Sequence, residues 1–378
     1  MSLFLLTFFA IYGGVHCYFF VRARAAFDFA LPVALLLILF LAAMTAAPVG
    51  VRFLEASGLE ASARILAYVA YLWMGFLFLF FSVSLLGDAW RLAVTLFGFL
   101  ARREVGHLLL SGRIAFLLPM AAALALALYA YGEATRIQSE RVTVTTAKLP
   151  PALPRLRIVQ LSDVHLGLIV REERLGKMLA LVRQAEPDIL VVTGDLLDGQ
   201  PDAYGRLAEL FRDIRPRLGK YFITGNHEFY VGLPQAETFA RTAGLTLLRG
   251  EGVNVAGLLN VAGVDDPAGA RSGLSRGGAE RELLDRLPRD CFTLLLKHRP
   301  VIDRDACGLF DLQLSGHVHK GQIFPFNLVT HLFYPVPTGL SSAGAGSLLY
   351  VSRGTGTWGP PLRLLATPEV TVIDLVRP

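Results

Sequence analysis

The sequence predicts two parts: an all-α transmembrane domain of about four helices, then an α/β domain with mixed β-sheets flanked by helices. Three observations lead to this prediction. The first third of the 378 residues is strongly apolar and poor in charge. The remainder alternates short apolar runs with amphipathic segments. Polar motifs follow several of those runs, as ligand-binding residues do in sheets of this kind.

The overall composition excludes a wholly soluble globular protein. The chain is 53% hydrophobic and 18% charged, with mean hydropathy +0.50, whereas soluble domains carry about 25% charged residues. The same composition excludes disorder. The net charge of +5 is small and no basic run is interleaved with aromatic residues, so we expect no nucleic-acid partner. The three cysteines show no metal-type spacing and are expected to be packed thiols.

Four stretches are long and apolar enough to cross a bilayer, which requires about 20 residues. We expect a transmembrane domain over 1–133, with spans at about 3–21, 29–49, 65–86 and 114–131. The segment at about 88–100 is nearly apolar and carries Trp90 and Arg91. We expect it to be a helix lying in the membrane interface.

The arginines of the connecting loops predict the orientation of the chain. Six lie in the loops after the first and third spans, and two lie in the loop after the second. By the positive-inside rule the first and third loops face the cytoplasm, which places the region after residue 133 outside. A cytoplasmic second domain is the alternative, and it follows if the segment at 88–100 crosses the bilayer.

We expect a linker over 134–154 and the second domain over 155–378. The prolines of LPPALP, which ends the linker, disfavour a helix. Beyond it, RIVQLSD, DILVVTGD and KYFITGNHE are predicted strands, separated by helices at 171–185 and 204–214. This order predicts a central sheet. From Leu245 onward predicted strands outnumber helices, which indicates a second, mixed sheet.

Polar residues collect just after the carboxyl ends of the predicted strands. They are Asp163-Val164-His165, Gly194-Asp195-Leu196-Leu197-Asp198, Gly225-Asn226-His227-Glu228, His298 and Gly316-His317-Val318-His319. Carboxylate, imidazole and amide ligands suit first-row divalent ions. The set is too large for one open catalytic ion and about right for two, which a lone carboxylate such as Asp195 can bridge.

On these motifs, residues 155–378 resemble the calcineurin-like metallophosphoesterase superfamily, and within it a bacterial subfamily of membrane-associated enzymes. The subfamily's closing pattern appears as LYVSRGTGTWGPPLR followed by PEVTVIDL. The resemblance implies a four-layer sandwich of two mixed β-sheets flanked by helices. Together with the four apolar spans, which lie outside the resemblance, it leads us to expect an integral protein of a bacterial inner membrane. One residue departs from the pattern, because Lys320 follows the last histidine where the subfamily usually has glycine.

The resemblance also implies the roles of the site residues. Two divalent metal ions are expected, Mn²⁺ first and Fe, Zn²⁺ or Mg²⁺ as alternatives. Their ligands would be Asp163, His165 and His319 for the first, Asn226, His298 and His317 for the second, and Asp195 for both. His227 would stand near the leaving-group oxygen and Asp198 would orient it, with Glu228 in support. Arg299, Lys320 and Arg353 are candidate phosphate contacts, or else ordinary surface cations.

The expected function is a membrane-anchored, dinuclear metal-dependent phosphoesterase that hydrolyses a phosphate ester or anhydride. A hydroxide bridging the two ions would attack phosphorus in line with the leaving oxygen. The segment Ile323–Leu340 is apolar and aromatic. It is either a core loop or an apolar lip that faces the bilayer. The second interpretation favours a phosphorylated, lipid-linked substrate, with membrane lipids as partners. His107 and His331 lack partners by spacing and are expected not to be ligands.

Three other functions are alternatives. An enzyme like UDP-2,3-diacylglucosamine pyrophosphatase, acting in the lipid A pathway, would need a cytoplasmic site. A non-catalytic membrane sensor or scaffold that binds phosphorylated ligands would be marked by missing metal ligands, and none is missing. A transporter or channel with a regulatory domain would show paired charges or Gly/Pro breaks within the spans, and the spans show little of either.

Overall fold

The computed structural model describes residues 3–199, 204–276 and 278–378 and divides into two compact units. The helical unit holds the chain up to Gly132 together with Gly359–Leu362. The second unit, here the phosphoesterase unit, holds Glu133–Trp358 and Arg363–Pro378. The division at 132 lies where the charge-poor third of the sequence ends.

Four long helices form the helical unit. They are α1 (Leu3–Phe27), α2 (Leu31–Ala56), α3 (Glu60–Ala101) and α4 (Gly112–Thr135), with a short 3-10 turn, η1 (Gly106–Leu108), before α4. Among the described residues these four are long and apolar enough to cross a membrane, as the sequence predicted. Their connections are shorter than expected, since the loop after α1 is Asp28–Ala30.

Helix α3 departs from the prediction. The expected span at 65–86 and the expected interfacial helix at 88–100 are parts of one helix of 42 residues. At 1.5 Å per residue this helix is about 63 Å long, roughly twice the thickness of a hydrocarbon core. Gly87 has space around it and continues the helix, because a single glycine lowers helix stability by only about 1 kcal/mol. The placement of 88–100 at the membrane surface stays a prediction.

Polar side chains join α1 to α3 inside the helical unit. Arg22, which was expected in a loop, lies within α1 and forms an ion pair of 2.8 Å with Asp88. Tyr18 donates a hydrogen bond of 2.6 Å to the same carboxylate. Elsewhere on α1, His16 accepts a bond of 2.9 Å from the indole of Trp73. Pairing of this kind is how apolar helices accommodate charged and polar side chains.

Two six-stranded mixed sheets build the phosphoesterase unit from its described residues. The first has the order β1 (Gln138–Thr145), β12 (Glu369–Val376), β2 (Arg155–Leu161), β3 (Ile189–Val192), β4 (Lys220–Phe222), β5 (Thr246–Leu247). The second has the order β10 (Gly339–Gly344), β11 (Ser347–Val351), β9 (Leu312–Ser315), β8 (Phe292–Leu296), β7 (Leu259–Gly263), β6 (Glu251–Val255). Strands β2 to β5 are parallel, as are β11, β9, β8 and β7.

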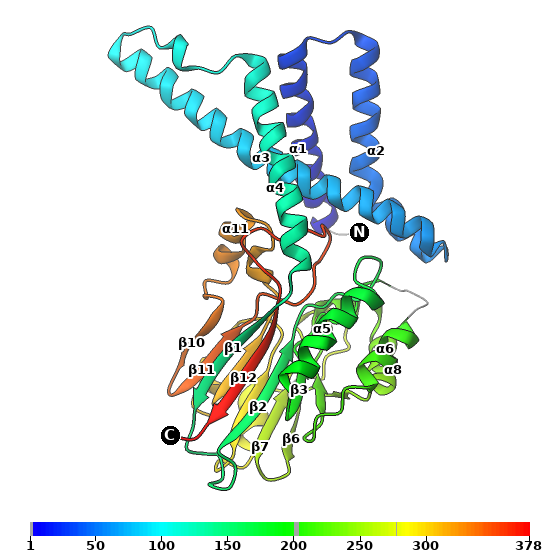
Figure 1. Ribbon diagram of the computed structural model, residues 1–378, viewed down its shortest axis with the longest axis vertical. Coiled ribbons are helices and arrows are strands. Elements are labelled where there is room, and N and C mark those ends of the chain that lie inside the picture. Colours follow the sequence, from blue (N-terminus) through cyan, green and yellow to red (C-terminus); the bar gives the residue numbers. More distant parts are fainter. Residues whose placement is uncertain (1–2, 200–203, 277) are drawn as a thin grey trace. The chain divides into compact units, whose positions relative to one another are not determined.

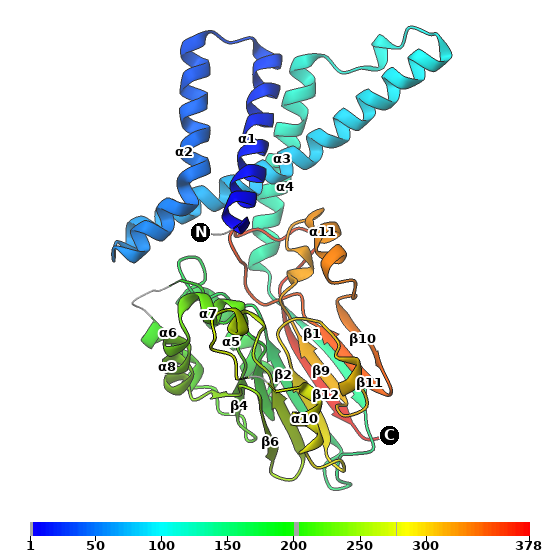
Figure 2. The ribbon, with the colours of Figure 1, turned by 180° about the vertical axis from the view of Figure 1, so that it is seen from behind.

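The helices of this unit are shorter. They are α5 (Glu172–Ala185), α6 (Tyr204–Arg212), α7 (Asn226–Val231), α8 (Leu233–Ala243), α9 (Ala268–Arg271), α10 (Glu280–Asp285) and α11 (Phe326–Phe333), with turns η2 (Arg304–Ala306) and η3 (His319–Gly321). Figure 1 shows α5, α6 and α8 along one side of the first sheet, and Figure 2 shows α10 from behind.

Successive side chains of the central strands point to opposite faces of the sheet, and this alternation explains how the layers pack. In β2, Val159 and Leu161 pack in a core with α5, α6 and α8, whereas Leu156 and Ile158 pack in the core between the two sheets. Strands covered on both faces carry apolar side chains toward both. A smaller cluster, including Leu284 of α10 and Leu295 of β8, covers the outer face of the second sheet. The result is a helix–sheet–sheet–helix sandwich, which confirms the predicted fold class.

The expected linker at 134–154 is corrected by the structure. It contains β1, which pairs in parallel with β12 with Gln138 opposite Glu369. Most side chains of β1 are exposed or half-exposed, so its sequence lacks the apolar run that marks a buried strand. Helix α4 ends at Thr135 and β1 begins at Gln138, so the actual connection is two residues long.

Candidate metal centre

The predicted site residues converge because strands of both sheets end at one edge. Asp163 and His165 follow β2, and Asp195 follows β3. Asn226 and His227 begin α7 just after β4, His298 follows β8, and His317 follows β9. Three overlapping groups result, each with ligand atoms within 4.8 Å of one another: Asp163, His165 and His319; His165, Asp195 and His227; Asp195, His298 and His317.

The first group is tightly packed. Nε2 of His319 lies 3.1 Å from Nε2 of His165 and 3.4 Å from Oδ1 of Asp163. Ser162 and the backbone N–H of His317 donate hydrogen bonds to the Asp163 carboxylate. The two imidazole nitrogens face each other beside a carboxylate oxygen. Ligands of one shared cation are arranged in this way.

The group of Asp195, His298 and His317 is joined to the first through the group of His165, Asp195 and His227, which shares a residue with each. Nε2 of His298 lies 3.2 Å from Oδ2 of Asp195 and 3.1 Å from Nδ1 of His317. Nδ1 of His298 donates to the carbonyl of Thr193 at 2.8 Å, which directs Nε2 toward Asp195. A hydrogen bond from the second ring nitrogen to a carbonyl is the usual way in which proteins orient a metal-binding histidine.

Burial and charge indicate that the site fits cations. The carboxyl of Asp163 is fully buried, and this burial raises its pKa to about 6. Burial also lowers the pKa of His165 and of His317 to about 3, so both imidazoles are neutral, the form that binds metals. Oδ1 of Asn226 and Nδ1 of His165 are buried without a hydrogen-bond partner among the described residues. A divalent cation would satisfy the buried carboxylates and the free Asn226 oxygen.

Glycines allow the close approach of these loops. A Cβ on Gly316 would lie 1.9 Å from Oγ of Ser162 and 2.1 Å from Oδ2 of Asp163. A Cβ on Gly225 would lie 2.2 Å from Oδ1 of Asp195. No side chain fits at either position, which explains the glycines that precede His317 and Asn226.

His227 and Asp198 lie together at the edge of the site. Nδ1 of His227 is 3.2 Å from Oδ1 of Asp198, and its ring packs 4.7 Å from that of His165. Burial opposes protonation of His227, but Asp195 and the bond to Asp198 outweigh it and raise the pKa of His227 to about 9. Trp358, half exposed, stacks edge-on to the same imidazole at 5.9 Å. The pairing matches the predicted orienting role of Asp198, which stays a prediction.

Glu228 has a larger structural part than the sequence indicated. Its buried carboxylate accepts four backbone hydrogen bonds, from Gly225, Asp195, Leu196 and Leu197, at 2.6 to 3.1 Å. It thereby joins the loop that carries Asp195 to the start of α7, which carries Asn226. The signal available in the sequence was a glutamate three residues after Gly225, a spacing at which its carboxylate can accept the backbone N–H that precedes a helix.

Sequence reasoning missed Arg363, which is fully buried. Its guanidinium donates to the carbonyls of His319, Arg353, Gly356 and Ala366 and lies 3.0 Å from Nδ1 of His319. It therefore joins the loop that contains Arg353 and Gly356 to the turn that carries His319. The only signal in the sequence was its place in the pattern WGPPLR.

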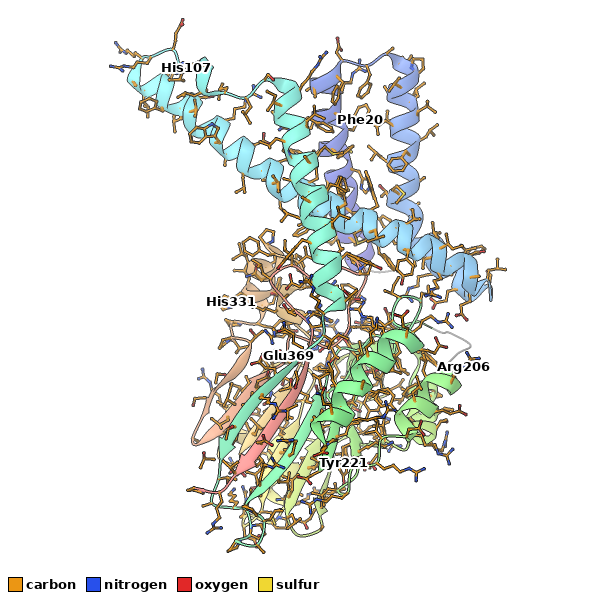
Figure 3. The ribbon with its side chains drawn as sticks, in the orientation of Figure 1. Phe20, His107, Arg206, Tyr221, His331 and Glu369 are labelled. Carbon is orange, nitrogen blue, oxygen red and sulfur yellow. The ribbon has the colours of Figure 1, made fainter. Side chains whose placement is uncertain are left out.

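The candidate phosphate contacts are arranged differently from one another. Arg299 donates two hydrogen bonds, of 2.7 and 3.0 Å, to the buried carboxylate of Asp266. Arg353 is paired with Glu369 and Glu140, and Figure 3 labels Glu369 at the start of β12. Both guanidinium groups are thus held by carboxylates. Lys320 is exposed. All three substrate contacts stay predictions, and the carboxylate partners disfavour the two arginines.

Comparison with known proteins assigns the chain to a family. The calcineurin-like phosphoesterase family matches residues 156–321. A metallophosphoesterase of Aquifex aeolicus is 39% identical over 254 residues, which are 67% of this chain and 97% of that protein. The bovine (Bos taurus) transmembrane protein with metallophosphoesterase domain is 33% identical over 301 residues, 75% of this chain and 68% of that protein. The solved NAD nucleotidase of Haemophilus influenzae superposes with TM-score 0.36 and 14% identity over 53% of this chain and 50% of that one. On the identity to the Aquifex and bovine proteins, the chain belongs to the calcineurin-like metallophosphoesterase family and is a phosphoester hydrolase.

Proposed function

We propose that this protein is a membrane-anchored phosphoesterase that hydrolyses a phosphate ester or anhydride of a lipid-linked substrate. Two divalent cations, Mn²⁺ by preference, would be held by the seven residues already named: Asp163, His165, Asp195, Asn226, His298, His317 and His319. The single observation that carries the proposal is the convergence of three carboxylate–imidazole groups, each within 4.8 Å, at one sheet edge.

The cations would lower the pKa of a water molecule and offset charge on the phosphoryl oxygens. The chain's own groups would do the rest. Oδ2 of Asp195 lies 4.0 Å from Nε2 of His165 and 3.2 Å from Nε2 of His298, so this carboxylate would contribute to holding both cations. His227 stands beside them with Nδ1 held by Asp198, so its Nε2 is free to donate a proton to the leaving oxygen or stabilise its charge. The buried loops held by Glu228 keep these groups in fixed positions.

The test uses the full chain in lipid nanodiscs, with metal content measured alongside activity. Phosphate release is followed from lipid phosphates, lipid pyrophosphates, nucleotide-linked lipids and a water-soluble aryl phosphate ester, with Mn²⁺ added or chelated. We expect about two ions per chain, and faster turnover of a lipid substrate than of the aryl ester. The Asp195→Asn variant should fold and lose both activity and metal. A folded parent protein that binds no divalent ion under any loading condition would overturn the proposal.

We further propose that the phosphoesterase unit lies outside a bacterial inner membrane, on the support of the arginine bias of the predicted loops. The alternative, a lipid A pathway hydrolase, needs the opposite side. A cysteine introduced at the exposed Arg206, in a background lacking Cys17, would be labelled in intact spheroplasts by a membrane-impermeant maleimide. Labelling that requires lysis of the spheroplasts would reverse the orientation.

A further inference from the structure

We infer that α11 is a membrane-contact helix: its apolar face inserts into the interfacial region of the bilayer and brings lipid-borne phosphate to the metal centre. The apolar side chains involved, here the α11 patch, are Phe324, Phe326, Leu328, Val329, Leu332 and Phe333. The membrane contact stands on the geometry of α11, and the delivery of substrate rests on the proposed function.

The α11 patch is exposed to an unusual degree. Leu328, Leu332 and Phe333 are 62%, 80% and 75% exposed, and none of the eight residues of α11 is buried. Single exposed apolar residues are common on soluble proteins, but contiguous apolar patches mark interaction sites or membrane contacts. Figure 3 shows α11 with its one labelled residue, the exposed His331.

The orientation of α11 is the reverse of that of a soluble surface helix. At 100° per residue, its five apolar residues occupy an arc of about 160°, and its polar residues occupy the opposite side. Asn327 and Thr330, on the polar side, are half-buried, whereas the apolar residues are exposed. A surface helix of a soluble protein packs its apolar stripe inward. This helix turns the stripe outward, which suits a lipid environment.

Charge distribution favours lipid over a polar partner. From Gly321 to Ser352 the sequence contains no Asp, Glu, Lys or Arg. Lys320, which directly precedes this segment, is exposed. An uncharged apolar segment can enter the interfacial region without burying a charge, and an exposed cation at its start suits anionic headgroups.

Chain connectivity favours lipid over a soluble protein. The phosphoesterase unit begins with β1 only two residues after α4, a helix long and apolar enough to span a membrane. Two residues reach about 7 Å at most. A unit tethered so briefly meets membrane lipid at a far higher effective concentration than any soluble partner.

Contacts at both ends of α11 connect it to the metal centre. A Cβ on Gly321 would lie 2.3 Å from the backbone of Asn327, so α11 packs directly against the turn that carries His319. Just after the helix, Tyr334 stacks edge-on to the ring of His317 at 5.2 Å. A lipid headgroup held at α11 would therefore stand beside the candidate metal ligands.

Single-cysteine labelling of the full chain in nanodiscs tests the contact directly. Cys17, Cys291 and Cys307 are first replaced, and an environment-sensitive fluorophore is attached at Leu332→Cys, Phe333→Cys or, on the polar side, His331→Cys. The matched control is Leu274→Cys, an exposed leucine of the same unit (46% exposed). We expect spin-labelled lipids to quench positions 332 and 333 at least threefold more than 274, with 331 between them. The inference would be overturned if spin-labelled lipid quenched positions 332 and 274 equally and aqueous iodide also quenched them equally. Strong energy transfer between copies without lipid quenching would also overturn it and would assign the patch to a self-interface.

A functional measurement separates this inference from the proposed function. The double variant Leu332→Asn/Phe333→Asn should hydrolyse the aryl ester at the parent rate and a lipid phosphate in vesicles at least tenfold more slowly. Equal loss on both substrates would contradict substrate delivery by α11. If the parent protein cleaves no phosphate ester but position 332 is quenched by lipid, the proposed function fails and the membrane contact stands.

Discussion

Replacing Glu228 by glutamine tests how the metal-binding loops are held together. The carboxylate accepts four backbone N–H groups, at 2.6 Å from Gly225, 2.9 Å from Asp195, 2.8 Å from Leu196 and 3.1 Å from Leu197. Glutamine keeps the shape but has one acceptor oxygen, and its amide would point N–H groups at the donors that lose their acceptor. About two buried N–H groups would be left unpaired.

Each unpaired buried N–H costs about 1–3 kcal/mol, so Glu228→Gln should destabilise the phosphoesterase unit by about 2–6 kcal/mol. For a unit of this size, 1 kcal/mol shifts Tm by about 2–4 °C, so we expect Tm to fall by at least about 4 °C. The loops of Asp195 and Asn226 should separate, so metal affinity should fall about tenfold or more.

The assay is thermal unfolding of the full chain in nanodiscs, with metal affinity measured by chelator competition. The control is Glu173→Gln, which removes the same charge from a side chain that is 86% exposed and should leave Tm and metal affinity unchanged. If Glu228→Gln unfolds within about 2 °C of the parent and binds metal equally well, then the four hydrogen bonds do not hold the site, and the reasoning fails.

Three other changes probe the site. Asp198→Asn should lower kcat about 10- to 100-fold, as loss of an orienting partner does, and leave the metal content intact; loss of metal would instead indicate a ligand role. Arg363→Met removes every hydrogen bond that the guanidinium makes to the carbonyls around His319, and differential scanning fluorimetry should show a lower Tm and a smaller gain on adding Mn²⁺. An unchanged gain would separate Arg363 from the site. Removal of metal with a chelator should lower Tm, because the buried carboxylate of Asp163 would lose the cation that balances its charge, and Mn²⁺ should restore the Tm. A Tm that neither treatment changes would argue against a bound ion.

Much of the fold was predictable because burial on two faces leaves a clear pattern. The run that became β3 is apolar throughout, and the run that became β8 is apolar except for Thr293, since both strands are covered on both sides. The run that became β2 keeps a central apolar pair, Ile158 and Val159, between polar residues. The helix α5 was predicted from its spacing, and Leu175, Met178, Leu179 and Val182 are buried as expected. The edge strand β1 was missed because its side chains are mostly exposed. Its place in the sheet depends on pairing with β12, far away in sequence.

In the helical unit, too, some features were predictable from the sequence and others depended on packing. Apolar length predicted four membrane-capable helices, because bilayer thickness sets a minimum run of residues. The continuity of α3 through Gly87 was not predictable, since a glycine between apolar runs is compatible with either a break or a helix. The pairing of Arg22 with Asp88 likewise depends on how α1 packs against α3.

The order and type of the polar motifs determined which residues would gather and the chemistry that they support, because parallel strands end at a common edge whatever the details of packing. Tertiary structure alone decided which groups hold that edge together and what it faces. Beyond the local bond of Glu228 to Gly225, both Glu228 and Arg363 bind backbone N–H and C=O groups far away in sequence, and those contacts leave no side-chain pattern. The outward direction of the apolar face of α11 is equally invisible in sequence, because amphipathic spacing specifies two faces but not which one the rest of the molecule covers.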